Sequence, residues 1–162
     1  MNGSASISAT TLVGADPDTA FKLFTEEVDA WWKQGPRFRP SLHGAGVLRF
    51  EPGVGGRLLE IYEGGASFEF GRVTVWEPGR RLVMEMRARN FGPGEFTQVE
   101  VRFEAAGEDT RVTVEHRGWD KFPADHPVKH GLDEQAFSDV MGVWWGDLLV
   151  SIRNHVHRTI TR

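Results

Sequence analysis

One histidine and two pairs of adjacent tryptophans are the residues of this sequence whose types and positions could support chemistry. His116, in "VEHRGW", ends a predicted strand whose alternation puts it on the same face as Val112 and Val114. An imidazole there could transfer protons near neutral pH, which makes His116 a weak candidate for a catalytic acid or base. A histidine on an apolar face is more often a hydrogen-bonded core residue, and both interpretations stay open.

The tryptophan pairs lie near opposite ends of the chain, in "VDAWWKQGPRF" and "GVWWGDLL". Trp31 and Trp32 end one predicted helical stretch, and Trp144 and Trp145 lie in another. Aromatic residues at helical spacing usually pack in a core, but they could also line a pocket for a flat, apolar ligand. Adjacent helical residues point about 100° apart, so one member of each pair should face the core more squarely.

The remaining motifs indicate no metal, cofactor or nucleophile. His126 and His130 have a spacing that a helix could turn into metal ligands, but Pro127 between them argues against a helix. His155 and His157 suit a surface position near a helix end, where the helix dipole favours cations. The glycine-rich "PGVGGR" lacks the Lys-Ser/Thr of a phosphate-binding loop, and neither Gly-x-Ser-x-Gly nor His-Glu-x-x-His occurs.

Several charged residues lie in predicted strands where alternation does not settle their facing. In "SFEFGRVTVW" the apolar pattern changes register between Phe70 and Val73, which predicts a β-bulge at Gly71. An inward-facing charge would need a partner and would be the first candidate to orient a polar ligand group. The residues whose facing stays open are Glu60, Glu69, Arg72, Glu85 and Arg87.

Composition narrows the class of protein. The 162 residues and 18.2 kDa predict one domain, and the net charge of -4 with scattered Lys and Arg argues against nucleic-acid binding. No apolar run reaches the length of a membrane span, and the first residues lack the features of a signal peptide, so we expect a cytoplasmic protein with no membrane partner. Six Trp and eleven Phe beside one Tyr favour a large apolar core or an apolar cavity.

The pattern of periods predicts the elements that would position these residues. Residues 6–13 alternate as a strand, and Asp16 with Pro17 begins one or two short amphipathic helices. About six strands follow between residues 47 and 117, with one hairpin turning near residues 106–109. A stripe of apolar residues then predicts a long helix over about residues 133–157: Phe137, Val140, Met141, Trp144, Trp145, Leu148, Ile152 and Val156.

This order of elements, with five short stretches, resembles the activator of Hsp90 ATPase homologue-like (AHSA1-like) branch of the SRPBCC, or START/Bet v 1-like, superfamily. The stretches are "DPDTAFKLFTEEVDAWW", "GVGGRLLE", "GRVTVWEPGRRLVMEM", "TRVTVEHRGW" and the C-terminal helix with its tryptophans. The resemblance implies an α+β helix-grip (Bet v 1-like) fold, in which a curved antiparallel β-sheet wraps around a long C-terminal α-helix and two short helices follow the first strand. It also implies an apolar cavity between sheet and helix, where both tryptophan pairs would meet.

The leading hypothesis from sequence is therefore the binding of a hydrophobic or aromatic small molecule in that cavity, without a cofactor. A protein-binding, chaperone-modulating module is the alternative, and a cyclase- or lyase-like enzyme acting on an aromatic or polyketide substrate is the second alternative. No residue decides for or against a homodimer. The predicted ligand-binding residues are Trp31, Trp32, Phe38, Phe70, Trp76, Met84, Met86, Val99, Val101, His116, Trp119, Phe137, Met141, Trp144, Trp145 and Leu148.

Overall fold

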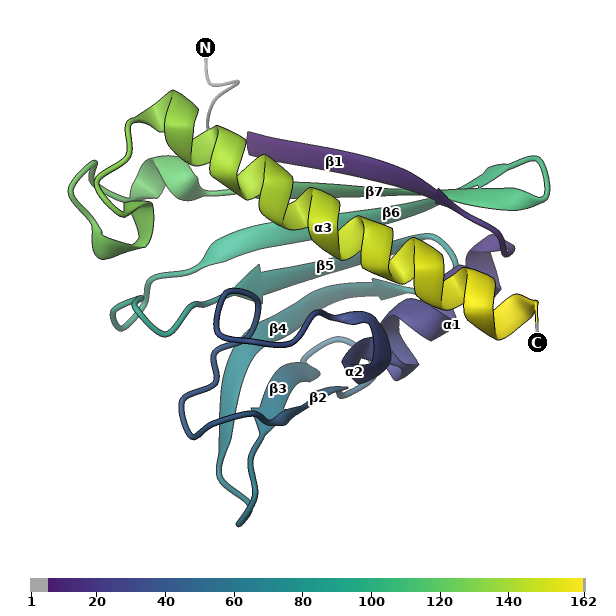
Figure 1. Ribbon diagram of the computed structural model, residues 1–162, viewed down its shortest axis with the longest axis horizontal. Helices are drawn as coiled ribbons and strands as arrows, with labels where there is room; N and C mark the ends of the chain where they lie inside the picture. The colour runs from purple at the N-terminus through teal and green to yellow at the C-terminus, as the bar shows by residue number, and fades with distance from the viewer. Residues whose placement is uncertain (1–5, 162) are drawn as a thin grey trace.

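A curved antiparallel sheet forms the body of the protein in the computed structural model, which describes residues 6–161 (Figure 1). Its seven strands have the order β1-β7-β6-β5-β4-β3-β2, so each strand after β1 pairs with its neighbour in sequence and β1 closes on β7. The strands are β1 (Ser6–Val13), β2 (Val47–Phe50), β3 (Arg57–Ile61), β4 (Ser67–Glu77), β5 (Arg81–Met86), β6 (Thr97–Ala106) and β7 (Asp109–Arg117).

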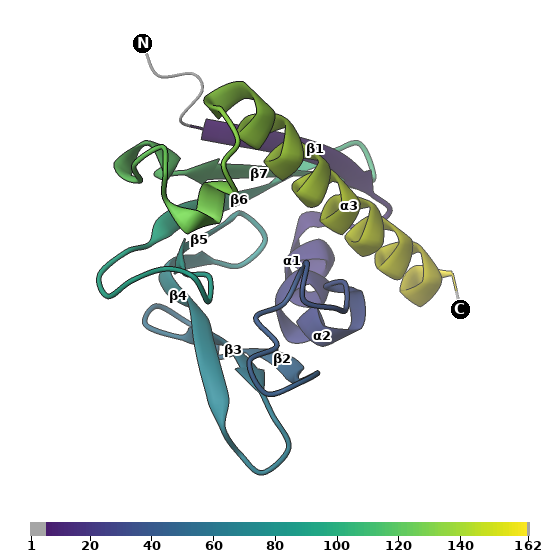
Figure 2. The ribbon, with the colours of Figure 1, turned by 60° about the vertical axis from the view of Figure 1, so that its left-hand side comes forward.

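The helices cover the concave side of this sheet. They are α1 (Pro17–Glu26), α2 (Val28–Trp31) and α3 (Glu134–Ile160), with two 3-10 turns, η2 (Trp119–Lys121) and η3 (Pro127–Lys129), before α3. Figure 2 shows α1 and α2 within the curve of the sheet, beside the C-terminal half of α3. The predicted α+β helix-grip fold is confirmed.

Aspartate caps begin the two longer helices. The Asp16 side chain accepts a hydrogen bond from the Thr19 amide at 2.7 Å, with Pro17 at the first position of α1. Asp133 accepts from the Ala136 amide at 2.8 Å and begins α3 close to the predicted boundary. None of the helices within residues 6–161 is long and apolar enough to span a membrane.

Strands β6 and β7 place their apolar faces as their alternation predicts. Val99 lies opposite His116 and Val101 opposite Val114, and all four side chains are buried. On the other side of β7, His116 pairs with Ile7 of β1. His116 therefore faces the interior from the middle of three strands.

The pairing register of strand β4 shifts at two places, and one of them lies next to Gly71, the predicted position of the bulge. Leu58 pairs with Gly71 but Leu59 pairs with Glu69, so the extra residue of the bulge is Phe70 and not Gly71. A Cβ on Gly71 would lie 3.0 Å from the Leu58 Cβ and 3.3 Å from the Met84 sulfur. Gly71 therefore allows the strand to pack closely on the core, while its neighbour carries the bulge.

The apolar stripe of α3 is buried except between Val140 and Trp144. Most of its predicted members are covered, and Leu149, which the prediction left out, is buried too. Val140 is 48% exposed, which corrects its assignment to the buried stripe, because this turn of α3 lies beside a hollow rather than against a strand.

Candidate ligand-binding cavity

The two tryptophan pairs form one aromatic cluster inside the fold. The ring centre of Trp32 lies 5.4 Å from that of Trp31, 6.0 Å from that of Trp144 and 5.9 Å from that of Trp145. In the second pair Trp145 is fully buried and Trp144 is half-buried, as adjacent helical positions predict. In the first pair both are 1% exposed, contrary to the prediction, because α2 ends at Trp31 and Trp32 already has an extended backbone.

The indole N–H groups of this cluster hold residues 36–40, the segment between α2 and β2. Trp144 donates to the Arg37 carbonyl at 2.7 Å, and Trp32 donates to the Phe38 carbonyl at 2.8 Å. From the loop after β5, Arg89 donates to the Pro40 carbonyl at 3.1 Å. Side chains from three separate parts of the chain therefore fix three of the carbonyls of segment 36–40.

Arg39 anchors the same segment from within. Its side chain is 1% exposed and forms an ion pair with Asp29 at 2.7 Å. It also donates to the carbonyls of Lys33, Asp29, Trp32 and Gly46. A buried guanidinium needs this many acceptors, so Arg39 is fully engaged in holding the loop.

Glu60 is the charged strand residue that faces inward. It is fully buried and accepts hydrogen bonds from the Tyr62 hydroxyl at 2.7 Å, the Gly46 amide at 3.3 Å and the Ser41 amide. Burial, and then the adjacent Glu60 carboxylate, raises the pKa of Tyr62 to about 12, so this phenol stays protonated and donates. Ser41 has a left-handed backbone with φ of 50°, so Glu60 supports a strained turn rather than a ligand group.

The other four residues whose facing the sequence left open, which are Glu69, Arg72, Glu85 and Arg87, face outward. Arg72 donates to Glu69 at 2.7 Å on the exposed face of β4, and Glu85 lies opposite Arg72 in the register of β4 and β5. Arg87 follows β5 and is exposed. The bulge in β4 made the facings of Glu69 and Arg72 unpredictable from alternation alone.

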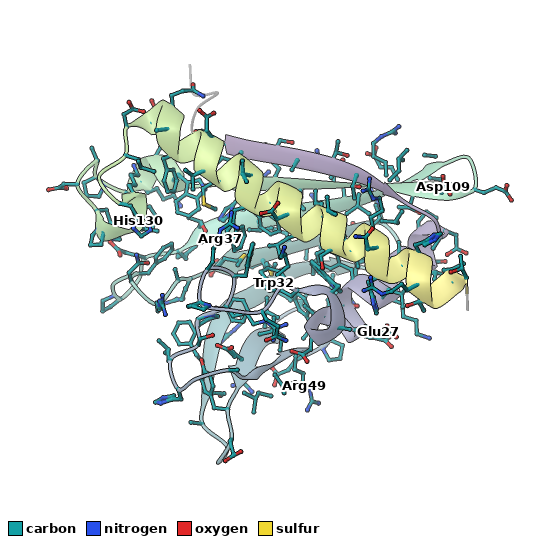
Figure 3. The ribbon with its side chains drawn as sticks, viewed as in Figure 1. Glu27, Trp32, Arg37, Arg49, Asp109 and His130 are labelled. Atoms are coloured by element: carbon teal, nitrogen blue, oxygen red, sulfur yellow. The ribbon has the colours of Figure 1, made fainter. Side chains whose placement is uncertain are left out.

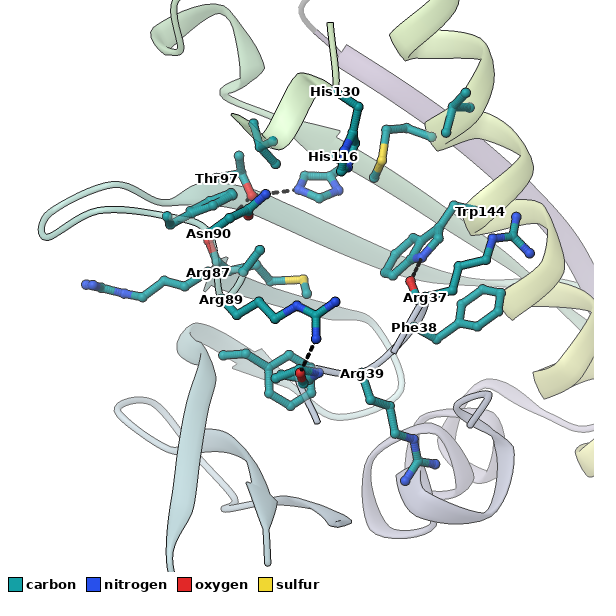
Figure 4. A pocket seen from close by; sticks show the side chains of 18 of the residues that line it. Arg37, Phe38, Arg39, Arg87, Arg89, Asn90, Thr97, His116, His130 and Trp144 are labelled. Atoms are coloured by element: carbon teal, nitrogen blue, oxygen red, sulfur yellow. Dashed lines mark hydrogen bonds between the residues drawn. The ribbon is translucent and has the colours of Figure 1, made fainter. Parts of the chain in front are cut away.

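A cavity of about 460 Å³ opens between segment 36–40, the loop after β5, the ends of β6 and β7, and the first half of α3 (Figure 4). Its aromatic and apolar walls include Phe70 of β4, Phe91 of the loop, Trp119 of η2 and Phe137 of α3. Sites that bind small molecules are commonly hollows of about 300–1,000 Å³ with mainly apolar walls and a few polar groups, and this cavity fits that description.

Half of the predicted ligand-binding residues lie on the cavity wall. The residues that line it are Phe38, Phe70, Met86, His116, Trp119, Phe137, Met141 and Trp144. The other predicted residues are outside the lining: Trp31, Trp32, Met84, Val99, Val101, Trp145 and Leu148 are buried in the core, and Trp76 packs against Phe21 with ring centres 5.1 Å apart.

Sequence reasoning missed most of the lining that comes from loops. The missed residues outside the strands are Pro36, Arg37, Arg39, Pro40, Ala88, Arg89, Asn90, Phe91 and Val128, and Thr97 of β6 was missed too, with Arg87, His130 and Val140 considered only for other roles. Loops carry no hydrophobic period, so no local signal assigns their facing. The proline and glycine residues of "GPRFRPS" mark a loop but not the side of the sheet on which it lies.

His116 lies at the inner end of the cavity with both ring nitrogens engaged. Trp145 donates its indole N–H to Nδ1 at 3.0 Å, which puts the imidazole proton on Nε2, and Nε2 donates to the Thr97 hydroxyl oxygen at 2.7 Å. Burial, with the adjacent Arg117 charge as a smaller cause, lowers the pKa of His116 to about 3. The imidazole is neutral and has no free lone pair for a substrate proton.

Trp119 carries an unsatisfied donor beside the cavity. Its indole N–H is buried and has no hydrogen-bond partner among residues 6–161. Trp119 and Phe137 pack edge to face with ring centres 4.9 Å apart, and both also line a second hollow of about 340 Å³. These two rings therefore form the wall between the two hollows.

The charges around the cavity are basic. None of its lining residues within the described part of the chain is acidic, although the whole chain carries a net charge of -4. Arg37 forms an ion pair with Asp147 of α3 at 3.3 Å, and Figure 3 shows Arg37 beside that helix. The lining of the cavity is therefore more positive than the chain as a whole.

The histidines outside the cavity wall do not form a metal centre. His126 contacts the Glu95 carboxylate at 2.8 Å, and His155 contacts Glu27 at 2.7 Å. Within residues 6–161, no three His, Cys, Asp or Glu side chains are grouped closely enough to hold a metal ion.

Comparison with known proteins adds to this geometry. Residues 14–141 match the family model described as "Activator of Hsp90 ATPase homolog 1-like protein". No curated protein matches the chain. Among solved structures, the chain is similar to a self-sacrificing resistance protein, CalC, from Micromonospora echinospora, with 28% identity, a TM-score of 0.65, and 98% of this chain and 97% of that chain covered.

Two further solved structures share the fold at lower identity. An HSP90 activator from Plasmodium falciparum is 19% identical with a TM-score of 0.61, covering 94% of this chain and 96% of that one. An Aha1 dimer from Colwellia psychrerythraea is 16% identical with a TM-score of 0.61, covering 93% and 95%. At these identities the likeness extends to the fold alone.

Proposed function

The chain belongs to the family of activator of Hsp90 ATPase homolog 1-like proteins, and from that premise we propose that it binds a small molecule with a mainly apolar body in the cavity. One observation carries the proposal: the cavity is open although the fold contains four paired tryptophans that could have filled it. Trp31, Trp32 and Trp145 pack behind the wall, while Trp144 forms part of the wall itself. The aromatic cluster is thus both core and support of a binding surface.

The likeness to a self-sacrificing resistance protein supports one biological context for this binding. That relative is 28% identical over almost the whole of both chains. A protein that captures a harmful small molecule needs a preformed apolar cavity more than it needs catalytic groups, and this cavity offers aromatic walls with an internally satisfied histidine. Capture of a toxic aromatic compound is therefore the context that we favour.

Native mass spectrometry of freshly purified protein, followed by solvent extraction, tests the proposal directly. We expect a stoichiometric adduct of a few hundred daltons, or, for an empty protein, saturable quenching of tryptophan fluorescence by an aromatic ligand panel. Trp119 and Trp144 line the cavity and supply the signal.

Two variants on the same helix show whether a ligand occupies the cavity. Met141 lines it, whereas Val143 is 58% exposed on the outer side of α3. Met141→Trp should fill the cavity and abolish binding, and Val143→Trp should leave binding unchanged. Equal binding by both variants, or no adduct and no response to the panel, would contradict the proposal.

A protein-binding, chaperone-modulating role is the second candidate, which rests on the family and on a stripe of exposed valines along α3. Val140, Val143 and Val150 are each more than 40% exposed on this helix. Apolar side chains grouped on one surface often mark a protein contact. The ATPase rate of a purified Hsp90 should then rise when the protein is added, and Val143→Glu should remove the effect, whereas an unchanged ATPase rate would count against this candidate.

A further inference from the structure

Four arginines line the cavity, and the structure distinguishes one of them from the rest. Arg39 is buried in its ion pair with Asp29, and Arg37 pairs with Asp147. In Figure 4 both side chains point away from the hollow, and Arg87, which follows the central strand β5, also extends away from it. These three guanidinium groups are therefore not available at the cavity entrance.

Arg89 instead reaches across the entrance. Its side chain comes from the loop after β5 and donates one N–H to the Pro40 carbonyl at 3.1 Å on the opposite wall (Figure 4). Arg89 has no acidic partner within residues 6–161, and its side chain is exposed to solvent at this point. A guanidinium has five N–H donors, so most of them are free to bind a ligand.

Several acceptors of the cavity wall are already engaged, whereas two of its donors are not. The carbonyls of segment 36–40 at Arg37, Phe38 and Pro40 already accept hydrogen bonds, and the lone pair of His116 Nδ1 is taken by Trp145. Among the groups that remain, the Arg89 guanidinium is a cation and the buried Trp119 N–H is a second donor, and the Asn90 amide and the His130 ring also line the cavity. Donors without acceptors call for a ligand that supplies acceptor atoms.

We propose that the ligand is an amphipathic carboxylic acid, whose apolar body fills the cavity and whose carboxylate binds Arg89 at the entrance; this rests on the proposed function. One uncompensated cation matches one negative charge, so a carboxylate suits the site better than a doubly charged phosphate. Because no acidic side chain lines the cavity, nothing in the described wall repels the anion.

Three compounds with the same ring system test this inference by isothermal titration calorimetry at pH 7.5. 1-Naphthaleneacetic acid is ionised at this pH, 1-naphthaleneacetamide is its neutral isostere, and 1-naphthyl phosphate carries close to two charges. We expect the acid to bind about tenfold more tightly than the amide, and more tightly than the phosphate, because only the acid forms a balanced charge-assisted contact.

A matched pair of arginine variants locates the contact. Arg89→Gln removes the charge but keeps an N–H for the Pro40 carbonyl, and Arg72→Gln makes the same change on the exposed face of β4, outside the cavity lining. The preference for the acid should disappear in Arg89→Gln and persist in Arg72→Gln, while the amide should bind all three proteins equally.

The outcomes separate this inference from the proposed function. If acid and amide bound the wild type equally, or if the preference persisted in Arg89→Gln, the carboxylate contact would be wrong while the cavity stayed a binding site. Tighter binding of the phosphate would overturn the choice of a single charge. If none of the three compounds bound, the proposed function itself would fail, and this inference with it.

Discussion

The indole N–H of Trp145 donates to Nδ1 of His116 at 3.0 Å, across the boundary between α3 and the sheet. This contact joins a residue of the second tryptophan pair to the single histidine that alternation places on the inner face of β7. It sets the tautomer, so that Nε2 donates to Thr97, whose hydroxyl lies 3.5 Å from the Met86 carbonyl. The histidine is thereby a hydrogen-bonded link between helix and sheet.

Stability should fall in acid because of His116. The unfolded chain binds a proton on this imidazole near pH 6.5, but the folded protein does so only near pH 3, so between these values the unfolded state holds more protons. The free energy of unfolding is therefore not lowered by His116 above pH 6.5. Below pH 6.5 it declines by up to about 1.4 kcal/mol per pH unit. Urea unfolding from pH 7.5 to 4.5 should show a smaller pH slope for His116→Gln than for the wild type, and equal slopes would contradict this account.

Two tryptophans near His116 should respond differently to the loss of their indole N–H. Trp145→Phe leaves the buried Nδ1 of His116 without a donor and should lower the free energy of unfolding by about 1–3 kcal/mol beyond the loss of ring contacts. Trp119→Phe removes a donor that has no partner among the described residues, so its effect should be clearly smaller. Thermal and urea unfolding of both variants measure the difference, and the reverse order would show that the hydrogen bond is not what stabilises this region.

Glu60 should be essential to the loop between α2 and β2. Glu60→Gln replaces one acceptor oxygen by an NH2 group facing the donors of Ser41, Gly46 and Tyr62, and should lower stability by about 1–3 kcal/mol. Glu69→Gln is the matched control, since Glu69 forms a partly exposed ion pair with Arg72 and should change stability by at most about 1 kcal/mol. Limited proteolysis should cut Glu60→Gln first within residues 40–46; an unchanged cleavage pattern would be evidence against this role.

Trp144→Phe should loosen segment 36–40 while the fold stays intact. The variant loses the hydrogen bond to the Arg37 carbonyl but keeps the aromatic stacking on Phe38, whose ring centre lies 5.8 Å away. The amides of Phe38 and Arg39, which donate to the Gly35 carbonyl, should then exchange with deuterium faster, by roughly tenfold for about 1.4 kcal/mol of lost local stability.

Trp76→Phe provides the control for that measurement. It makes the same chemical change at a tryptophan that packs on Phe21 of α1 and does not line the cavity. Exchange at Phe38 and Arg39 should match the wild type in this variant. If both variants accelerated exchange equally, the effect would reflect global stability and not the contact between Trp144 and segment 36–40.

The sequence alone determined the elements and the faces that obey a simple period. Alternation in β6 and β7 placed Val99, Val101 and His116 inside, and helical spacing placed Trp145 and Leu148 in the core. These features follow from local geometry, because a strand repeats every two residues and a helix about every 3.6. The same reasoning failed at Val140, where the period continues but no strand lies opposite.

Only the tertiary structure decided which residues form the cavity and which polar groups stay free. The bulge at Phe70 breaks the alternation of β4, and segment 36–40 has no period at all. Its position depends on Trp144, 107 residues away from the carbonyl it holds, and on Arg89, 49 residues from Pro40. Contacts at such separation depend on how helix, sheet and loops pack together, and no local pattern of residue types encodes them.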